Sequence, residues 1–365
     1  MLSELTASTR RLALVGLAKN TGKTVALAAL LRELRDQGRP VGVTSVGRDG
    51  EEHDVIDARI EKPSVQLCAG SLVATTDGLL RASGIPHELL EETGVRTPLG
   101  RVLIARLRGA GAVEVAGPSA ATEVRAVSDA MLAHGAEQVL IDGAVDRRAA
   151  SSPDVADGLI MCTGAVISDE LSEVVLQTRD AVDLVRLPSA DDGSASARTL
   201  REIAVGGKAL DASHASMLVR EDLEAVALPP RFVLTSDAEE IAQVLDANPA
   251  ARWLTVAGAL PDRFLRSLVH PVHHRRRELV VVVADPTKVF LWKRGPEWYR
   301  RQGVHLQTLN DIDLEALTVN PVAPQSHRFE SARLRALLHE AIADVPIFDV
   351  LDPGYTGARQ PTPLV

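Results

Sequence analysis

One stretch of the chain, Gly16-Leu-Ala-Lys-Asn-Thr-Gly-Lys-Thr24, contains the residue types that hold a phosphate chain. Gly22 lets the backbone turn tightly, so that its N–H groups can point at phosphate oxygens. The Lys23 ammonium would reach the β- and γ-phosphates, and the Thr24 hydroxyl would bind Mg²⁺. These types predict a nucleoside triphosphate site formed by Gly16, Lys19, Asn20, Thr21, Gly22, Lys23, Thr24 and Val25.

The elements expected around this stretch also suit phosphate binding. An apolar run at 12–15 predicts a strand, and a helical pattern follows from Lys23 to about Asp36. A helix N-terminus presents unpaired N–H groups and the positive end of the helix dipole. Strand, glycine loop and helix in this order are typical of a P-loop. The spacing differs from the strict pattern, because Gly16 leaves five residues before Gly22-Lys23 and Leu17 stands where the glycine is expected; the alternative is a chance Gly-Lys-Thr in a loop.

Carboxylates at other predicted strand ends could complete a magnesium site. Asp142 ends the apolar run 138–142, as a Walker-B carboxylate does, or else it caps the following turn. A predicted strand at 41–45 is followed by a polar loop in which Asp49 or Asp54 could reach the metal, while Asp49 could also be only a turn residue. Mg²⁺ prefers oxygen ligands, and carboxyl ends of parallel strands meet at one edge. The predicted metal ligands are Thr24, Asp49 or Asp54, and Asp142, and the predicted catalytic residues are Lys23 and Asp142.

Several polar residues near these positions admit two interpretations. Lys19 could add a second positive charge over the phosphates, or it could be a solvated loop lysine. Asp146 and Arg147 could position water or a γ-phosphate oxygen, or form a surface ion pair. Ser119 could cap the helix predicted from 119 to 134 or contact a substrate. The possible substrate or switch residues are Arg48, Ser119, Asp146 and Arg147.

The sequence favours ATP over GTP. Proteins that read guanine with a P-loop use a late Asn/Thr-Lys-x-Asp segment. The nearest candidate, Thr287-Lys-Val-Phe290, has Phe where Asp is required.

Composition narrows the class of protein. The 365 residues are 45% hydrophobic but only 3% aromatic, so the core must be built from Ala, Val and Leu, which suits helices packed on a parallel sheet. A net charge of -9 argues against nucleic acid or a membrane surface as a general partner. Cys68 and Cys162 provide no disulfide framework, which predicts a cytoplasmic protein, and no apolar run approaches membrane-spanning length.

The alternation of apolar strands and helical patterns predicts an α/β fold. We expect a P-loop NTPase domain at 1–190, with a parallel sheet covered by helices on both faces. The segment Pro188-Ser-Ala-Asp-Asp-Gly-Ser194 suggests a linker, which we expect at 191–207, followed by a second, smaller α/β domain at 208–365. The less regular parts predict strands at 181–187 and 231–234, a short helix at 87–92, and a hairpin of 102–107 with 112–116.

Several short stretches of the sequence resemble two groups of proteins, a broad group and a narrower one. The spacing from Gly16 to Thr24 is similar to that of the dethiobiotin-synthetase-like branch of P-loop proteins, over about the first half of the chain. In that group, the P-loop Thr, an Asp after the second strand and an acidic residue before Gly-Ala hold magnesium. The resemblance implies these roles for Thr24, for Asp49 or Asp54, and for Asp142.

The narrower resemblance is to the P-loop subunit of the lysine aminomutase reactivase. It implies ATP-driven exchange of damaged adenosylcobalamin on an aminomutase, with a MutS-like ATPase as partner. The broader resemblance, to relatives of the dethiobiotin type, suggests a homodimer by analogy. The motifs of the narrower resemblance are the stretch from Gly16 to Thr24, Thr44-Ser-Val-Gly-Arg-Asp-Gly-Glu51, Ala116-Gly-Pro-Ser119, Leu140-Ile-Asp-Gly-Ala144, Cys162-Thr-Gly-Ala165 and Thr318-Val-Asn-Pro-Val-Ala-Pro324.

Two alternatives to such an ATPase stay open. An ATP-dependent ligase or carboxylase would need a polar substrate pocket beside the γ-phosphate, lined by Ser119, Arg106 or Arg147. A nucleotide sensor would bind ATP and barely hydrolyse it. For the segment after residue 319, which begins Asn320-Pro321, the sequence alone favours a rigid connector to the last helix.

Overall fold

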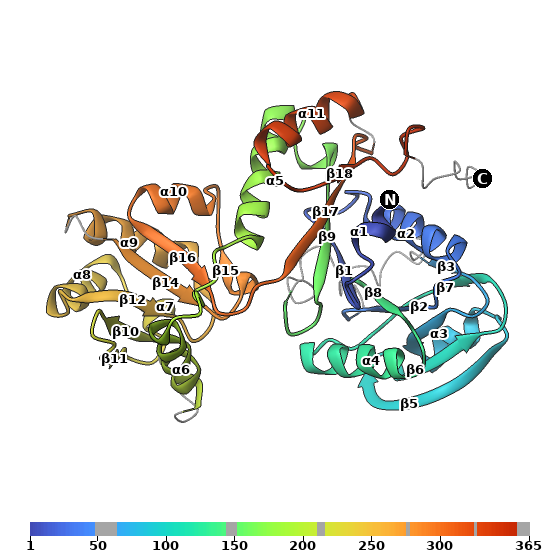
Figure 1. The fold of residues 1–365 in the computed structure, drawn as a ribbon, viewed down its shortest axis with the longest axis horizontal. Helices are drawn as coiled ribbons and strands as arrows, with labels where there is room; N and C mark the ends of the chain where they lie inside the picture. The colour runs from blue at the N-terminus through green and yellow to red at the C-terminus, as the bar shows by residue number, and fades with distance from the viewer. Residues whose placement is uncertain (48–63, 144–151, 210–215, 275–277, 325–326, 356–365) are drawn as a thin grey trace. The chain divides into compact units, whose positions relative to one another are not determined.

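A computed structural model describes residues 1–47, 64–143, 152–209, 216–274, 278–324 and 327–355 (Figure 1). The chain divides into two units, which are described separately. The large unit consists of Met1–Thr178 together with Ile312–Val365, and the inserted unit is Arg179–Asp311. Within the described ranges, no helix has the length and apolar character needed to span a membrane.

The large unit is built on a mostly parallel sheet. In the part of the chain that is described, this sheet has nine strands, of which β18 through β4 run parallel and β6 and β5 antiparallel to their neighbours. The strands in spatial order are β18 (Ile347–Phe348), β17 (Asp313–Asn320), β9 (Gly158–Gly164), β1 (Arg11–Gly16), β8 (Gln138–Asp142), β2 (Val41–Ser45), β4 (Leu72–Thr76), β6 (Gly100–Leu107) and β5 (His87–Thr97).

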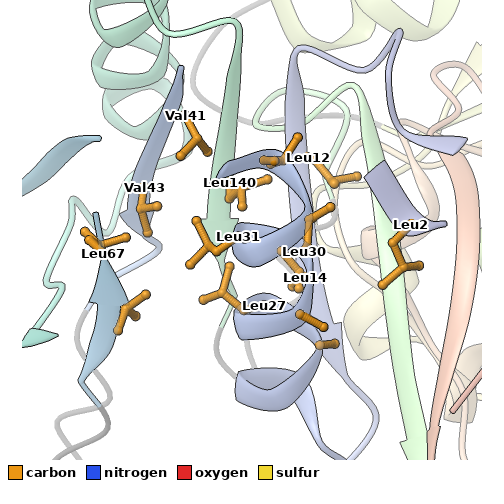
Figure 2. Packing of buried hydrophobic residues seen from close by; sticks show 14 of the residues in the cluster. Leu2, Leu12, Leu14, Leu27, Leu30, Leu31, Val41, Val43, Leu67 and Leu140 are labelled. Carbon is orange, nitrogen blue, oxygen red and sulfur yellow. The ribbon is translucent and has the colours of Figure 1, made fainter. Parts of the chain in front are cut away.

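Helix α2 (Lys23–Asp36) covers one face of this sheet through a row of leucines (Figure 2). Side chains alternate between the two faces of a strand, so every second residue of the central strands meets this helix. Full burial of one such leucine contributes about 1.5–3 kcal/mol. The packed residues are Leu27, Leu30 and Leu31 of α2, Leu12 and Leu14 of β1, Val41 and Val43 of β2, and Leu140 of β8.

Helix α4 (Ala121–Ala133) covers the opposite face. A Cβ atom placed on Gly42 would lie 2.8 Å from the Cε atom of Met131 and 3.3 Å from Val139. Gly42 lies between Val41 and Val43, which face α2, so Gly42 faces the opposite side of the sheet. Because it has no side chain, Met131 of α4 can occupy the space there. The predicted α/β architecture, a largely parallel sheet with helices on both faces, is therefore confirmed for this unit. Its remaining elements are α1 (Leu2–Leu5), α3 (Asp77–Ala82), α11 (Ser331–Ala341), the first part of α5 (Leu171–Val185), the 3-10 helix Ala165–Ile167, and the small sheet of β3 (Val65–Leu67) and β7 (Gly111–Val113).

The inserted unit is a second, smaller α/β structure with its own core. Strands β12, β14 and β16 run parallel, while β10 and β11 form an antiparallel pair at one edge. One face packs against α8 and α9, and the other against α6. The elements are α6 (Ala195–Ala209), β10 (Met217–Arg220), β11 (Ala225–Ala227), α7 (Phe232–Thr235), α8 (Ala238–Ala247), β12 (Ala251–Thr255), β13 (Leu260–Pro261), α9 (Asp262–His274), β14 (Leu279–Val283), the 3-10 helix Pro286–Lys288, β15 (Val289–Phe290), α10 (Pro296–Arg301) and β16 (Val304–Thr308).

The expected boundaries, with domains at 1–190 and 208–365 and a linker at 191–207, differ from these units. Most of the expected linker is helix α6, and the Ser194 hydroxyl accepts a hydrogen bond from the N–H of Ala197 at 3.0 Å, which is an N-cap contact. Asp, Gly and Ser mark both linkers and helix starts, so composition could not separate the two. The chain after 311 returns to the large unit because β17 pairs with β9.

Four local predictions are also wrong. Residues 181–185 continue helix α5, and residues 232–235 form helix α7. Residues 87–92 belong to strand β5, which pairs with β6 in a hairpin, whereas 111–113 pairs with β3 in a separate sheet. Each error concerns a short segment, whose type depends on which distant segment it pairs with or packs against.

Both tyrosines of the chain are buried against carboxylates. Tyr299 donates a hydrogen bond to the Asp262 Oδ1 atom at 2.5 Å, and Tyr355 donates one to Glu33. Glu33 also accepts a hydrogen bond from the N–H of Ser3 at 2.9 Å, so this network ties the C-terminal segment to α2 and the N-terminus. Burial, and then the hydrogen bond to the carboxylate, raises the pKa of each phenol far above its ordinary value.

This pairing predicts loss of stability in alkaline solution. The neutral phenols are favoured in the folded state, so their contribution is complete below the unfolded pKa of about 10 and is lost as pH rises past it. We expect each tyrosine to lower the free energy of unfolding by about 1.4 kcal/mol per pH unit above about pH 10. Urea unfolding at pH 9, 10 and 11 checks this, with tyrosinate absorbance as a direct readout. Tyr299→Phe and Tyr355→Phe should each remove their share of the slope, and tyrosinate absorbance in the folded protein near pH 10 would contradict the prediction.

Candidate functional site

The segment between β1 and α2 forms a tight loop at the carboxyl edge of the large sheet. Asn20 and Gly22 both have left-handed backbone conformations, with φ of 67° and 88°. The N–H of Leu17 donates to the carbonyl of Cys162 at 2.9 Å, and the Thr21 hydroxyl donates to the carbonyl of Ala18 at 3.0 Å. Gly22 is the N-cap residue of α2, and no side chain in the described structure caps this helix. The first-turn N–H groups of α2 are thus available to an anion at the loop.

Lys23 and Asp142 form an ion pair at this loop. The Lys23 Nζ atom lies 3.0 Å from Asp142 Oδ1 and also donates a hydrogen bond to the Gly143 carbonyl. The side chains are 13% and 27% exposed, so both charges are largely withdrawn from bulk water but still reachable. The structure therefore brings together the two residues that the sequence predicts as catalytic.

The ends of the neighbouring strands hold Asp142 in this place. Asp142 is the last residue of β8 and is in register with Leu14 of β1 on one side and Ser45 of β2 on the other. Its carbonyl accepts a hydrogen bond from the N–H of Val46 at 3.1 Å, and the N–H of Gly143 donates to the Leu14 carbonyl at 3.0 Å. The carboxylate consequently lies at the same sheet edge as the loop, where ligands of open α/β sheets bind.

The other predicted loop residues are accessible at this edge, except two. Gly16 and Thr21 are buried and shape the loop. Thr24 is exposed in the first turn of α2, where its hydroxyl is available as a ligand. Also exposed are Lys19, Asn20 and Val25.

Ser119 follows a segment that packs against the end of β2. The Gly47 N–H donates to the Pro118 carbonyl at 2.6 Å, and the Gly117 N–H donates to the Ser45 hydroxyl at 2.9 Å. Ser119 itself is exposed and does not cap α4, whose N-cap residue is Ala120. The capping interpretation of Ser119 is therefore wrong, because the helix begins one residue later than expected.

Arg106 does not lie at this edge. It is paired with Leu72, the first residue of β4, and its Nη2 atom donates to the His134 carbonyl at 2.8 Å. Since β4 runs parallel to β2, its first residue lies at the amino edge of the sheet, opposite the loop. The substrate pocket that a ligase would need therefore cannot include Arg106.

The described oxygen donors are compatible with magnesium. Mg²⁺ in nucleotide sites commonly uses one or two protein oxygens, together with phosphates and water. Thr24 and Asp142 are of this type, whereas the described residues contain no group of three or more His, Cys, Asp or Glu side chains that could hold a metal alone. Five predicted site residues lie outside the described residues: Arg48, Asp49, Asp54, Asp146 and Arg147.

A buried thiol lies beneath the loop without taking part in it. Cys162 is in register with Gly16 and is fully buried. Burial raises the pKa of this thiol to about 11. The thiol is therefore neutral at physiological pH, which excludes it as a nucleophile there.

Sequence reasoning missed one residue of the site, Asn320. Its Nδ2 atom donates a hydrogen bond to the Asn20 carbonyl of the loop at 2.9 Å, although 300 positions separate the two residues. Asn320 is the last residue of β17, just as Asp142 is the last residue of β8. A polar residue that ends a parallel strand was thus the available signal at both places.

Comparisons of this chain with family models, with curated proteins and with solved structures find no match.

Proposed function

We propose that this protein binds ATP with Mg²⁺ at the Gly16–Val25 loop and hydrolyses it. The observation that carries the proposal is the Lys23–Asp142 ion pair. It places an ammonium at the start of a helix and a carboxylate at the end of the adjacent parallel strand, beneath a loop with a left-handed glycine. A triphosphate site needs this combination of a cation for the phosphates and a carboxylate for the metal.

Each residue has a defined part in this proposal. Gly22 and the N–H groups of the first turn of α2 would bind phosphate oxygens, and Lys23 would exchange its contacts with Asp142 and Gly143 for the β- and γ-phosphates. Thr24 and Asp142 would hold Mg²⁺, together with Asp49 or Asp54. Bound magnesium neutralises charge on the phosphates.

Titration calorimetry tests the nucleotide site. We expect saturable binding of ATP in the presence of Mg²⁺, weaker binding in EDTA, and weaker binding of GTP. The proposal also predicts release of inorganic phosphate that depends on Mg²⁺. Absence of binding to either nucleotide at millimolar concentration would refute the nucleotide site. Binding of ATP without hydrolysis under every condition would instead favour the alternative of a nucleotide sensor.

We further propose that ATP hydrolysis serves a reactivase, which exchanges damaged adenosylcobalamin on an aminomutase in the cytoplasm with a MutS-like ATPase. The support is the set of motifs spread from Gly16 to Pro324. Two of them, the loop and the segment that begins Thr318-Val-Asn320, are joined by the Asn320–Asn20 hydrogen bond. This function requires a partner that responds to the nucleotide state, and a homodimer is part of the proposal.

An ATPase assay distinguishes a reactivase from a ligase or carboxylase. A reactivase predicts phosphate release that rises when an inactivated cobalamin-dependent aminomutase and the MutS-like ATPase are added. A ligase or carboxylase predicts stimulation by a small carboxylic acid or amine in the absence of any protein partner. Stimulation by the small molecule alone would therefore overturn the reactivase assignment and leave the nucleotide site intact.

A further inference from the structure

The loop is held by a residue from the far end of the chain. The Asn320 carboxamide has two hydrogen bonds with definite directions. Its oxygen accepts from the N–H of Val322 at 3.1 Å, and its nitrogen donates to the carbonyl of Asn20 at 2.9 Å. A backbone N–H can donate only to the oxygen, so the turn at Val322 points the nitrogen towards the loop.

Packing around Asn320 leaves it little freedom to move. Asn320 is in register with Gly164 of β9, and a Cβ atom on Gly164 would lie only 2.2 Å from the Asn320 carbonyl oxygen. A Cβ atom on Gly22 would lie 3.2 Å from the Cβ of Asn320. The following Pro321 has a fixed φ and no N–H. These contacts hold the backbone and the Cβ atom of Asn320 in place, and its two hydrogen bonds orient the partly exposed carboxamide towards the loop.

The loop gains from this contact because of its backbone conformation. Asn20 is a non-glycine residue in the left-handed region, a conformation that Asn adopts more readily than most residues but that is still less stable than an ordinary one. Asn20 itself is exposed, so its own side chain is not buried in a way that would enforce this conformation. The hydrogen bond from Asn320 acts on the carbonyl of this same residue.

We propose that Asn320 is a positioning residue, which holds the Gly16–Val25 loop in its phosphate-binding conformation before the nucleotide arrives. This inference rests on the proposed nucleotide site. A loop that is already ordered does not lose conformational freedom when it binds, so affinity is higher. Asn320 then acts on nucleotide binding through the Asn20 backbone, without contacting the phosphates.

The test compares Asn320→Ala and Asn320→Asp with a matched control. Asn320→Asp keeps the acceptor for Val322 but removes the donor for Asn20. Asn310 is the control, since it also follows a parallel strand, is partly buried, and donates from Nδ2 to a backbone carbonyl, that of Ala284, at 3.3 Å in the inserted unit.

We expect the dissociation constant for ATP with Mg²⁺ to rise about fivefold to tenfold in Asn320→Ala, as for loss of one hydrogen bond. Asn320→Asp should weaken binding at least as much, and Asn310→Ala should not change it. Because nucleotide can reorder the loop once bound, KM should rise while kcat stays within about twofold. The unfolding temperature of the free protein should change little, while its increase on adding nucleotide becomes smaller.

Each other result has a distinct meaning. Wild-type affinity in both Asn320 variants would overturn the positioning role and leave the proposed function standing. The positioning role would also be overturned if Asn310→Ala had an equal effect, or if the loss of affinity were matched by destabilisation of the free protein. Either result is expected of a residue whose role is purely structural. Absence of nucleotide binding by the wild-type protein would refute the proposed function itself, and the positioning role with it.

Discussion

Replacing Lys23 by alanine is expected to weaken ATP binding at least about 100-fold, because two charge-assisted hydrogen bonds to phosphates together contribute about 3 kcal/mol or more. The ammonium is the partly buried cation at the loop and is held 3.0 Å from Asp142. Its removal would leave the carboxylate of Asp142 facing the phosphates without the Lys23 charge between them. Calorimetry with ATP and Mg²⁺ measures the change in the dissociation constant.

Lys19→Ala is the matched control for this substitution. Lys19 belongs to the same loop, carries the same charge and is exposed. An exposed charge is screened by water and salt, so we expect a change of less than about threefold. Circular dichroism and the unfolding temperature verify that both variants fold. If Lys23→Ala bound ATP as tightly as the wild type, the site proposed here would be wrong.

Replacing Gly164 by alanine is expected to destabilise the protein by about 3 kcal/mol or more, because the new methyl group has no space. A Cβ atom at Gly164 would lie 2.2 Å from the carbonyl oxygen of Asn320 and 3.0 Å from its carbonyl carbon. Both are backbone atoms of the paired strand, so relief requires β17 to move away from β9. Urea unfolding measures the change in the free energy of unfolding.

Gly158→Ala, at the other end of the same strand, provides the comparison. There the nearest atoms to an added Cβ belong to side chains, the Glu315 Oε1 atom at 2.8 Å and the Thr9 Cγ2 atom at 3.1 Å, and side chains can shift at the cost of the Thr9–Glu315 hydrogen bond, whereas a paired backbone cannot. We expect a cost below about 1.5 kcal/mol. Equal destabilisation by the two substitutions would show that the close approach of the two strands at Asn320 is not the cause. Since Gly164→Ala also displaces Asn320, it should weaken nucleotide binding, whereas Gly158→Ala should not.

The centre of the large sheet could be predicted from the sequence because its signals are local. The predicted bounds of α2, β2 and β8 agree with the structure. Buried parallel strands are continuous apolar runs, and Gly or Pro marks their ends. The same signals placed Asp142 at a strand end, which brought it to Lys23. These predictions needed no knowledge of how distant segments pair.

The remaining errors come from distant pairing. Strand β5 carries polar residues along its length and is a strand because β6 pairs with it. Likewise, the last part of the chain returns to the large unit because β17 pairs with β9, although the residues of the inserted unit separate these two strands in the sequence. No local pattern reports such a pairing, so the sequence placed 312–365 in the wrong unit. For the same reason, the sequence alone favours a connector at Asn320 and does not reveal its contact with the loop.

The position of the inserted unit in the chain determines an order of events during protein synthesis. Chains emerge from the ribosome N-terminus first and domains fold as units, so residues 179–311 emerge before strand β17 does. Pairing between β17 and β9 is long-range and therefore slow to form. The loop begins near residue 16, but it receives its support only when residue 320 has been added. A nascent chain that stops earlier would carry every residue from Gly16 to Asp142 and still lack the hydrogen bond from Asn320 to the loop.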